Sequence, residues 1–278
     1  MTVDLGETGG VTLQLVGWWH TSLRVIAVLN VALWSIAALA VTRAHALSDA
    51  ETHLGYVQLL LSAVYVAGCA FRSLLPVIDI PRLVLIDSRL SSVLIGRSIA
   101  TVAELCFAVQ WALVLHHTAL LSGSPFVQAL SWAVVPLIVL AQAFCWYAVL
   151  TTEQRAHALE NSLWGLTAAL TVAGVLVIGP HRLGGLYFPV IAGGLAYVAF
   201  IFLYDVPMYW SRWRVDQGNG HKYLSLAEGI VDVWRRWTVS YRWQDWKSEV
   251  PWMSLYFTLG VWSSIWLVHA SLAFGSHG

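Results

Sequence analysis

The residues best suited to take part in a reaction lie in one long apolar segment in the first half of the chain. Arg97, Thr101 and Glu104 follow one another there at i, i+4 and i+7, a spacing that places all three on one face of a helix. A carboxylate in apolar surroundings can act as a general acid or base, and a nearby arginine can orient or neutralise an anionic group. We therefore predict Glu104 and Arg97 as catalytic residues. They are separated by about 10 Å along the helix axis, so a tight pair would need help from other helices.

A second group of polar residues is expected to converge on the same region and to bind substrate. The predicted substrate-binding residues are Asp79, Arg82, Asp87, Gln142, Glu160, Asn161 and Asp205. The simplest arrangement is a cytoplasm-facing cavity of mixed charge with Glu104 at its floor, which would suit an active site, a lipid headgroup pocket or a permeation vestibule. The competing interpretation is structural, because charged networks can lock helix packing and residues near helix ends can reach water. Asn30 is expected to join helices rather than to bind a ligand.

No metal site is predicted, and the nature of any cofactor is left open. The sequence lacks the clustered histidine boxes of metal-dependent lipid desaturases and hydroxylases. His116, His117 and His269 are predicted to lie toward the outer side, where a haem or a metal ion could bridge them. The other histidines, His157 among them, are expected to be solvated.

The remaining residue types argue against several other chemistries. A retinal Schiff base needs a lysine inside the bundle, whereas Lys222 and Lys247 fall in a polar connection. The sequence has no GxGxxG, P-loop or HExxH motif. The cysteines form no CxxC pair, and we expect Cys69, Cys106 and Cys145 to pack as small buried hydrophobes.

The elements that must hold these residues are membrane-spanning helices. Of the 278 residues, 58% are hydrophobic and only 11% are charged, against about 25% charged in an ordinary soluble domain. A helix needs roughly 20 apolar residues to cross the hydrocarbon core. Such runs predict spans at Leu23–Thr42, Gly55–Pro76, Leu90–His116, Phe126–Leu150, His157–Gly179, Gly184–Asp205 and Trp252–Phe274. The predicted fold is all-α, with one transmembrane domain over 1–278 that forms a seven-helix bundle.

The distribution of basic residues gives the predicted orientation, because cytoplasmic loops accumulate Lys and Arg. With seven spans, all but two of the 15 Lys and Arg residues fall on the N-terminal side of the membrane. They are Arg24, Arg72, Arg82, Arg89, Arg97, Arg155, Arg212, Arg214, Lys222, Arg235, Arg236, Arg242 and Lys247. Only Arg43 and Arg182 fall on the other side. We therefore predict a multi-pass protein of the cell membrane with a cytoplasmic N-terminus and an outside C-terminus.

The connection over 206–251 is predicted to be a Trp-rich cytoplasmic segment at the membrane surface. Ser225 and Glu228 have the spacing of a capping box, and the apolar residues that follow recur on one helical face. A helix of this kind, rich in Trp and Arg, is typical of the headgroup layer. The segment could also dock a protein partner.

Three classes of function stay open at this point. The first is a membrane-embedded enzyme that acts on a lipid or isoprenoid-type substrate, a hydrophobic or amphipathic small molecule, through the cytoplasm-facing cavity. The second is a proton-coupled transporter or channel that uses Glu104 and Arg97, and the third is a sensor or accessory subunit of a complex. The formal net charge of zero gives no indication of nucleic-acid binding.

Overall fold

The chain is a multi-pass, all-α membrane protein. The computed structural model describes residues 7–43, 49–180 and 187–273, and these are almost entirely helical. Among them, six helices are long and apolar enough to cross a membrane. They cover Gln14–Arg43, His53–Leu74, Val93–Ser122, Pro125–Thr151, Gln154–Ile178 and Tyr187–Gly218. These helices agree with the first six predicted spans, while Arg182, the first three residues of the sixth predicted span and the last residue of the seventh lie outside the described residues.

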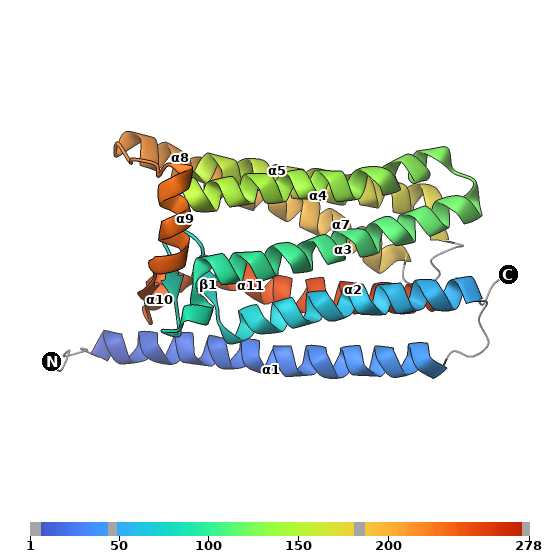
Figure 1. The fold of residues 1–278 in the computed structure, drawn as a ribbon, viewed down its shortest axis with the longest axis horizontal. Helices are drawn as coiled ribbons and strands as arrows, with labels where there is room; N and C mark the ends of the chain where they lie inside the picture. The colour runs from blue at the N-terminus through green and yellow to red at the C-terminus, as the bar shows by residue number, and fades with distance from the viewer. Residues whose placement is uncertain (1–6, 44–48, 181–186, 274–278) are drawn as a thin grey trace. The chain divides into compact units, whose positions relative to one another are not determined.

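The helices are α1 (Glu7–Arg43), α2 (Asp49–Leu74), α3 (Val93–Ser122), α4 (Pro125–Thr151), α5 (Gln154–Ile178), α7 (Tyr187–Phe200), α8 (Val206–Gly218), α9 (Leu226–Arg235), α10 (Trp243–Trp246), α11 (Val250–Leu255) and α12 (Val261–Ala273). Two π-helical segments, η3 (Ile201–Asp205) and η4 (Tyr256–Gly260), and a 3₁₀ turn, η1 (Arg89–Ser91), complete the helical elements. Figure 1 labels most of these helices along the ribbon. The chain forms two compact units. Unit 1 comprises Met1–Glu104 and Val233–Leu272, and unit 2 comprises Leu105–Asp232 and Ala273–Gly278. The prediction of a single domain over 1–278 stays a prediction.

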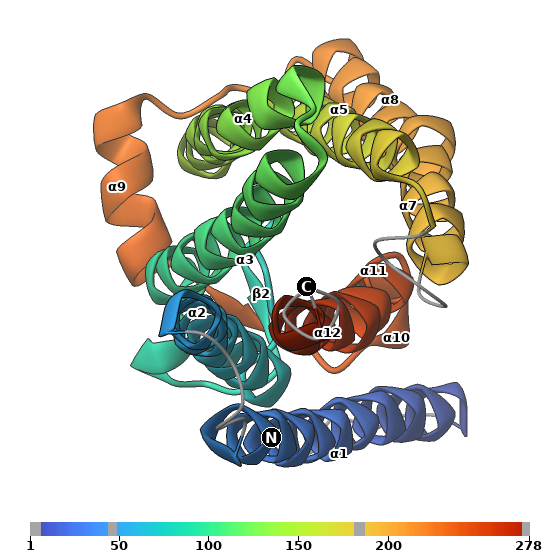
Figure 2. The same cartoon turned by 90° about the vertical axis from the view of Figure 1, so that its right-hand side faces the viewer.

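In unit 1, α1 packs along α2, and the helix that runs from α11 through η4 lies against both of them (Figure 2). Asn30 is buried and joins two of these helices, because its amide donates to the carbonyl of Phe257 while its oxygen accepts from Trp262 Nε1. The expectation that Asn30 serves helix packing is therefore confirmed.

A small sheet, which the sequence analysis did not predict, closes one end of unit 1. Strands β1 (Val77–Ile78) and β2 (Leu83–Val84) form an antiparallel hairpin, and β3 (Thr238–Val239) pairs with β2 in parallel. The apolar residues that alternate with charges in 76–88 fit this hairpin, since strand side chains alternate between faces. At the same end, Trp19 of α1 packs against the fully buried Trp246, with ring centroids 5.5 Å apart.

In unit 2, α5 is central and packs against α4, α7 and α8 (Figure 2). The turn between α4 and α5 is short because Thr152 adopts a left-handed conformation, with φ 67°, directly after α4 ends. Leu224 donates its amide to the Thr151 carbonyl, and the hydroxyl of Thr152 bonds His221. The chain that follows α8 is thus tied to the α4–α5 turn.

The sixth predicted span continues beyond its expected end at Asp205. Segments α7, η3 and α8 follow one another without a break to Gly218, so the helix enters the segment 206–251 before it turns. Pro207 has no N–H to donate, and the π-helical register of η3 just before it accommodates the missing bond.

Candidate functional site

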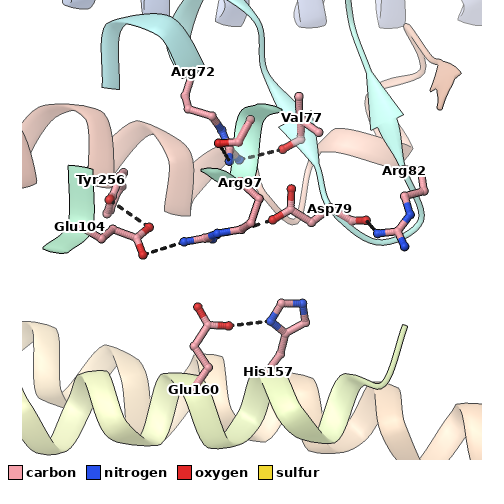
Figure 3. Close-up of polar contacts among 10 residues, drawn as sticks. Arg72, Val77, Asp79, Arg82, Arg97, Glu104, His157, Glu160 and Tyr256 are labelled. Carbon is pink, nitrogen blue, oxygen red and sulfur yellow. Dashed lines mark hydrogen bonds and ion pairs between the residues drawn. The ribbon is translucent and has the colours of Figure 1, made fainter. Parts of the chain in front are cut away.

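The centre of the predicted site is a buried ion pair within α3. Arg97 Nη2 donates to Glu104 Oε2 at 2.7 Å, and both side chains are less than a tenth exposed (Figure 3). The two residues therefore pair directly, although about 10 Å of helix axis separates them, and their need for help from other helices stays a prediction. An interval of seven residues returns to almost the same face of the helix, and the two long side chains extend toward each other along it.

Two further elements of unit 1 complete the network around this pair. Tyr256, in η4, donates its hydroxyl to the second carboxylate oxygen of Glu104 at 3.2 Å. On the other side, Asp79 Oδ2 lies 3.9 Å from Arg97 Nη1 (Figure 3). Tyr65 of α2 packs edge-on against the Tyr256 ring at 5.9 Å. The structure therefore places Glu104 among polar partners, inside the protein rather than toward lipid.

The β1–β2 hairpin positions Asp79. The hairpin contains a cis peptide bond before Pro81, and Arg82 has a positive φ of 75°. The guanidinium of Arg82 is almost completely buried and donates to the carbonyl of Asp79 at 2.6 Å. Arg72, at the end of α2, donates to the carbonyls of Val77 and Gly96 and so joins the hairpin to α3.

This polar network holds charged groups of both signs. Three guanidinium groups, of Arg72, Arg82 and Arg97, accompany two carboxylates, of Asp79 and Glu104. Asp79 Oδ1 and Arg72 Nε are buried and have no hydrogen-bond partner among the residues that the structure describes. The network can therefore offer both a carboxylate oxygen and a guanidinium N–H to a ligand.

Asp87, which was predicted to line the same site, lies at the surface. It is exposed, and its carboxylate accepts from Trp237 Nε1 at 2.9 Å, which ties the end of the hairpin connection to the Trp-rich segment. Asp87 belongs to unit 1, as Asp79 and Arg82 do.

The other predicted substrate-binding residues belong to unit 2, and all of them are buried: Gln142, Glu160, Asn161 and Asp205. Glu160 Oε2 forms a 2.7 Å hydrogen bond with Nδ1 of His157, one turn earlier on α5 (Figure 3). The Asn161 amide donates to the carbonyl of His157. The single cavity that would unite these residues with Glu104 stays a prediction.

Three residues of these two clusters were not predicted from the sequence. Tyr256 had no distinguishing pattern, because one tyrosine in an aromatic-rich segment does not reveal its partner. His157 was expected to be solvated, but it is buried, with only 7% of its surface exposed. Its spacing of three residues from Glu160 on one helix was the available signal. Cys145 is buried, as expected, and lies beside this pair.

An open depression of about 460 Å³ lies on α8 and is lined by Pro207, Trp210, Ser211 and Arg214. It contains none of the predicted site residues. Comparison with protein-family models, with curated proteins and with solved structures gave no match.

Proposed function

We propose that this protein is a membrane-embedded enzyme that acts on an anionic lipid or isoprenoid-type substrate at the network of Asp79, Arg97, Glu104 and Tyr256. Substrate enters from the cytoplasmic leaflet. The observation that carries the proposal is a carboxylate held at membrane depth by an arginine and a tyrosine from two different elements. Buried ionisable groups in a membrane span cost free energy, so a network of this size indicates a functional role for these residues.

The donors of the network support an anionic substrate. A phosphate or carboxylate headgroup accepts hydrogen bonds from guanidinium groups. The unpartnered N–H of Arg72 is a donor for such a headgroup. In this scheme Glu104 transfers a proton to or from the substrate, and Tyr256 fixes the orientation of its carboxylate.

Seven spans and a cytoplasmic N-terminus are part of the proposal. The helical run from Val250 to Ala273 has no break, and at about 1.5 Å per residue it is roughly 36 Å long, enough to cross the bilayer. In unit 1, the hydrogen bond between His20 and the Leu74 carbonyl brings the N-terminal half of α1 to the end of α2. The β1–β2 hairpin lies at the same end, because Arg72 donates to the Val77 carbonyl. The positive-inside rule then favours the cytoplasm for that end.

Helix α9 supports the surface part of the proposal. Its capping box forms as expected, since Glu228 accepts from the Ser225 amide and Ser225 Oγ accepts from the Glu228 amide. Leu226, Ile230 and Trp234 follow at four-residue intervals and are about half exposed. An apolar stripe of this kind fits the headgroup layer, where it would anchor the cytoplasmic face.

The test is turnover by the full-length protein in liposomes made from a total polar lipid extract, followed by mass spectrometry of the lipids. Native mass spectrometry of the purified protein would identify a retained lipid. Glu104→Gln is expected to abolish turnover, while Arg24→Gln, which removes an exposed arginine of α1, is expected to leave it unchanged. Full turnover by a folded Glu104→Gln variant would contradict the proposal.

A proton-coupled transporter or channel is a second candidate, and one observation favours it. The π-helical segments η3 and η4 interrupt two helices. Segment η3 carries the buried Asp205, and η4 carries the half-buried Tyr256, which donates to Glu104. Such irregular backbone is common at functional sites, including transport pathways. Proton flux into liposomes that is lost in Glu104→Gln, without any change in the lipids, would support this candidate instead.

A further inference from the structure

A second polar cluster lies in unit 2 and takes no part in the proposed reaction. It consists of Cys145, His157 and Glu160, all buried, whose potential ligand atoms lie within 4.8 Å of one another. The imidazole and the carboxylate are already in contact at 2.7 Å. One sulfur, one nitrogen and one oxygen donor thus converge inside a bundle of apolar helices.

The helices place these donors firmly. His157 and Glu160 are three residues apart and share one face of α5, and Cys145 comes from α4, the helix packed most extensively against α5. Tyr209 of α8 lies against the His157 ring, with centroids 5.1 Å apart, so the imidazole is held from its face. The ligand atoms of a tetrahedral zinc site are about 3.5 Å apart, given bonds of about 2.0–2.3 Å, so side-chain movements of about 1 Å would suffice.

We propose that Cys145, His157 and Glu160 bind a zinc-type divalent transition-metal ion. A thiolate, an imidazole and a carboxylate are the ligands that Zn²⁺ uses in proteins. Their charges also fit the surroundings, because one thiolate and one carboxylate neutralise a divalent cation when the imidazole is neutral. On binding, the thiol proton leaves to solvent, and the proton shared by His157 and Glu160 stays on the imidazole nitrogen that does not bind the metal. The metal–sulfur bond forms, and the ion replaces the hydrogen bond between His157 and Glu160.

The three side chains leave a fourth position open on a tetrahedral ion. Gln154 precedes His157 by three residues and so lies on the same face of α5. Its Oε1 is buried and has no hydrogen-bond partner in the part of the chain that the structure describes. This oxygen is a candidate for the fourth ligand, or for the acceptor of a metal-bound water. A site with an open or water-filled position is typical of catalytic rather than purely structural zinc.

The test is metal content and metal spectroscopy on the full-length protein in detergent. Protein expressed with added zinc is expected to contain one zinc ion per chain. Protein expressed with cobalt instead is expected to show the thiolate-to-Co²⁺ charge-transfer band of a cysteine ligand. Cys145→Ala is expected to lose that band, and His157→Ala and Glu160→Gln are expected to lose most of the bound metal.

Matched controls come from the same unit. Cys106→Ala removes a cysteine of α3, and His116→Ala removes a histidine that contacts Ser131 and Trp132 instead of the cluster. Both are expected to keep the metal and the band. Wild-type protein without stoichiometric metal, or a charge-transfer band that survives in Cys145→Ala, would overturn the proposal. Since the measurement on the wild type needs no variant, a variant that fails to fold does not affect this test.

Discussion

At the scale of single residues, the Arg97–Glu104 pair shows how a charge can be kept inside a membrane. The 2.7 Å contact leaves the pair with no net charge, and Tyr256 occupies the second carboxylate oxygen. Removing one partner of a buried ion pair leaves the other charge uncompensated, which is far more costly than the pair itself. The energetics of this site therefore depend on whether the two residues are changed singly or together.

A double-mutant cycle tests that dependence. Arg97→Gln and Glu104→Gln are each expected to lower the free energy of unfolding by about 3–5 kcal/mol, because each leaves one buried charge. The double variant is expected to recover most of this loss, as measured by denaturant titration in mixed micelles. Arg24→Gln, at an exposed position, should stay within about 0.5 kcal/mol of wild type.

The same cycle separates a structural role from a functional one. If the pair only locks the helices, the double variant recovers stability and activity together. If Glu104 transfers a proton, the double variant recovers stability but stays inactive. Losses that simply add in the double variant would show that the two side chains are not coupled.

Asn30 gives a second prediction at this scale. Asn30→Leu keeps the branching of the side chain at Cγ but removes the bonds to the Phe257 carbonyl and to Trp262 Nε1. We expect a loss of about 1–2 kcal/mol in the free energy of unfolding, because two hydrogen bonds between membrane helices are lost and each contributes about 0.6 kcal/mol on average and up to about 1.7. Ser35→Ala, an exposed position on the same helix, serves as the control. Equal stabilities of the two variants would contradict the role given to Asn30.

At the scale of elements, the position of α9 depends on one glycine. A Cβ on Gly229 would collide with the backbone carbonyl of Leu150, at the end of α4. Gly229→Ala is therefore expected to displace the start of α9 and to lower the free energy of unfolding by about 1–3 kcal/mol, as overpacking does. The readouts are thermal unfolding and faster limited proteolysis around residues 219–235.

The matched control for this change is Gly218→Ala at the end of α8. Its added Cβ would meet nothing within 4 Å, so stability and proteolysis should stay close to wild type. Proteolysis of Gly229→Ala at the wild-type rate would show that α9 does not rest on the Leu150 carbonyl.

The turn that leads into α10 gives a prediction about pH. The Ser240 hydroxyl, and then Arg242, bond the carboxylate of Asp245 and lower its pKa below the ordinary value of 3.8. A lowered pKa in the folded state means that the carboxylate stabilises the fold above pH 3.8. That stabilisation is lost as the pH falls through the lower folded value.

The comparison of wild type with Asp245→Asn measures this effect. Near neutral pH the wild type should be more stable, by no more than about 1 kcal/mol because Arg242, the charged partner of Asp245, is largely exposed to solvent. The difference should disappear in acid. A difference that is unchanged or larger at the lowest pH at which the protein still folds would contradict the assignment of the carboxylate to these bonds.

At the scale of the whole molecule, apolar length predicted most of the helices, because a span needs about 20 apolar residues whatever its neighbours are. The helix spacing of Arg97 and Glu104 likewise identified the polar face of α3. Contacts that join distant segments gave no such signal. Neither the bond from Tyr256 to Glu104 nor the pairing of Thr238 with Leu83 leaves a local pattern, since each depends on how separate elements pack. His157 was misjudged for the same reason, because Tyr209, a residue on another helix, covers it.

The number of spans decides where the C-terminus lies, and it can be measured with single cysteines in the full chain. Thr2→Cys, Asn219→Cys and Gly278→Cys report the N-terminus, the Trp-rich connection and the C-terminus, respectively. The native cysteines are buried or half-buried, so their background labelling by a membrane-impermeant thiol reagent should be low.

With seven spans, intact cells should label only the cysteine at 278, and the other two positions should react only after permeabilisation. The tryptophans of Val250–Ala273 are the reason for testing this helix in particular. Trp252, Trp262 and Trp266 contribute less apolar character by hydropathy than aliphatic residues would, although their rings partition readily at the membrane interface. If positions 219 and 278 are labelled from the same side, the helical run from Val250 to Ala273 does not cross the bilayer. The C-terminus would then lie on the same side of the membrane as the Trp-rich segment. The proposed substrate path from the cytoplasmic leaflet would have to be revised for a protein with six spans.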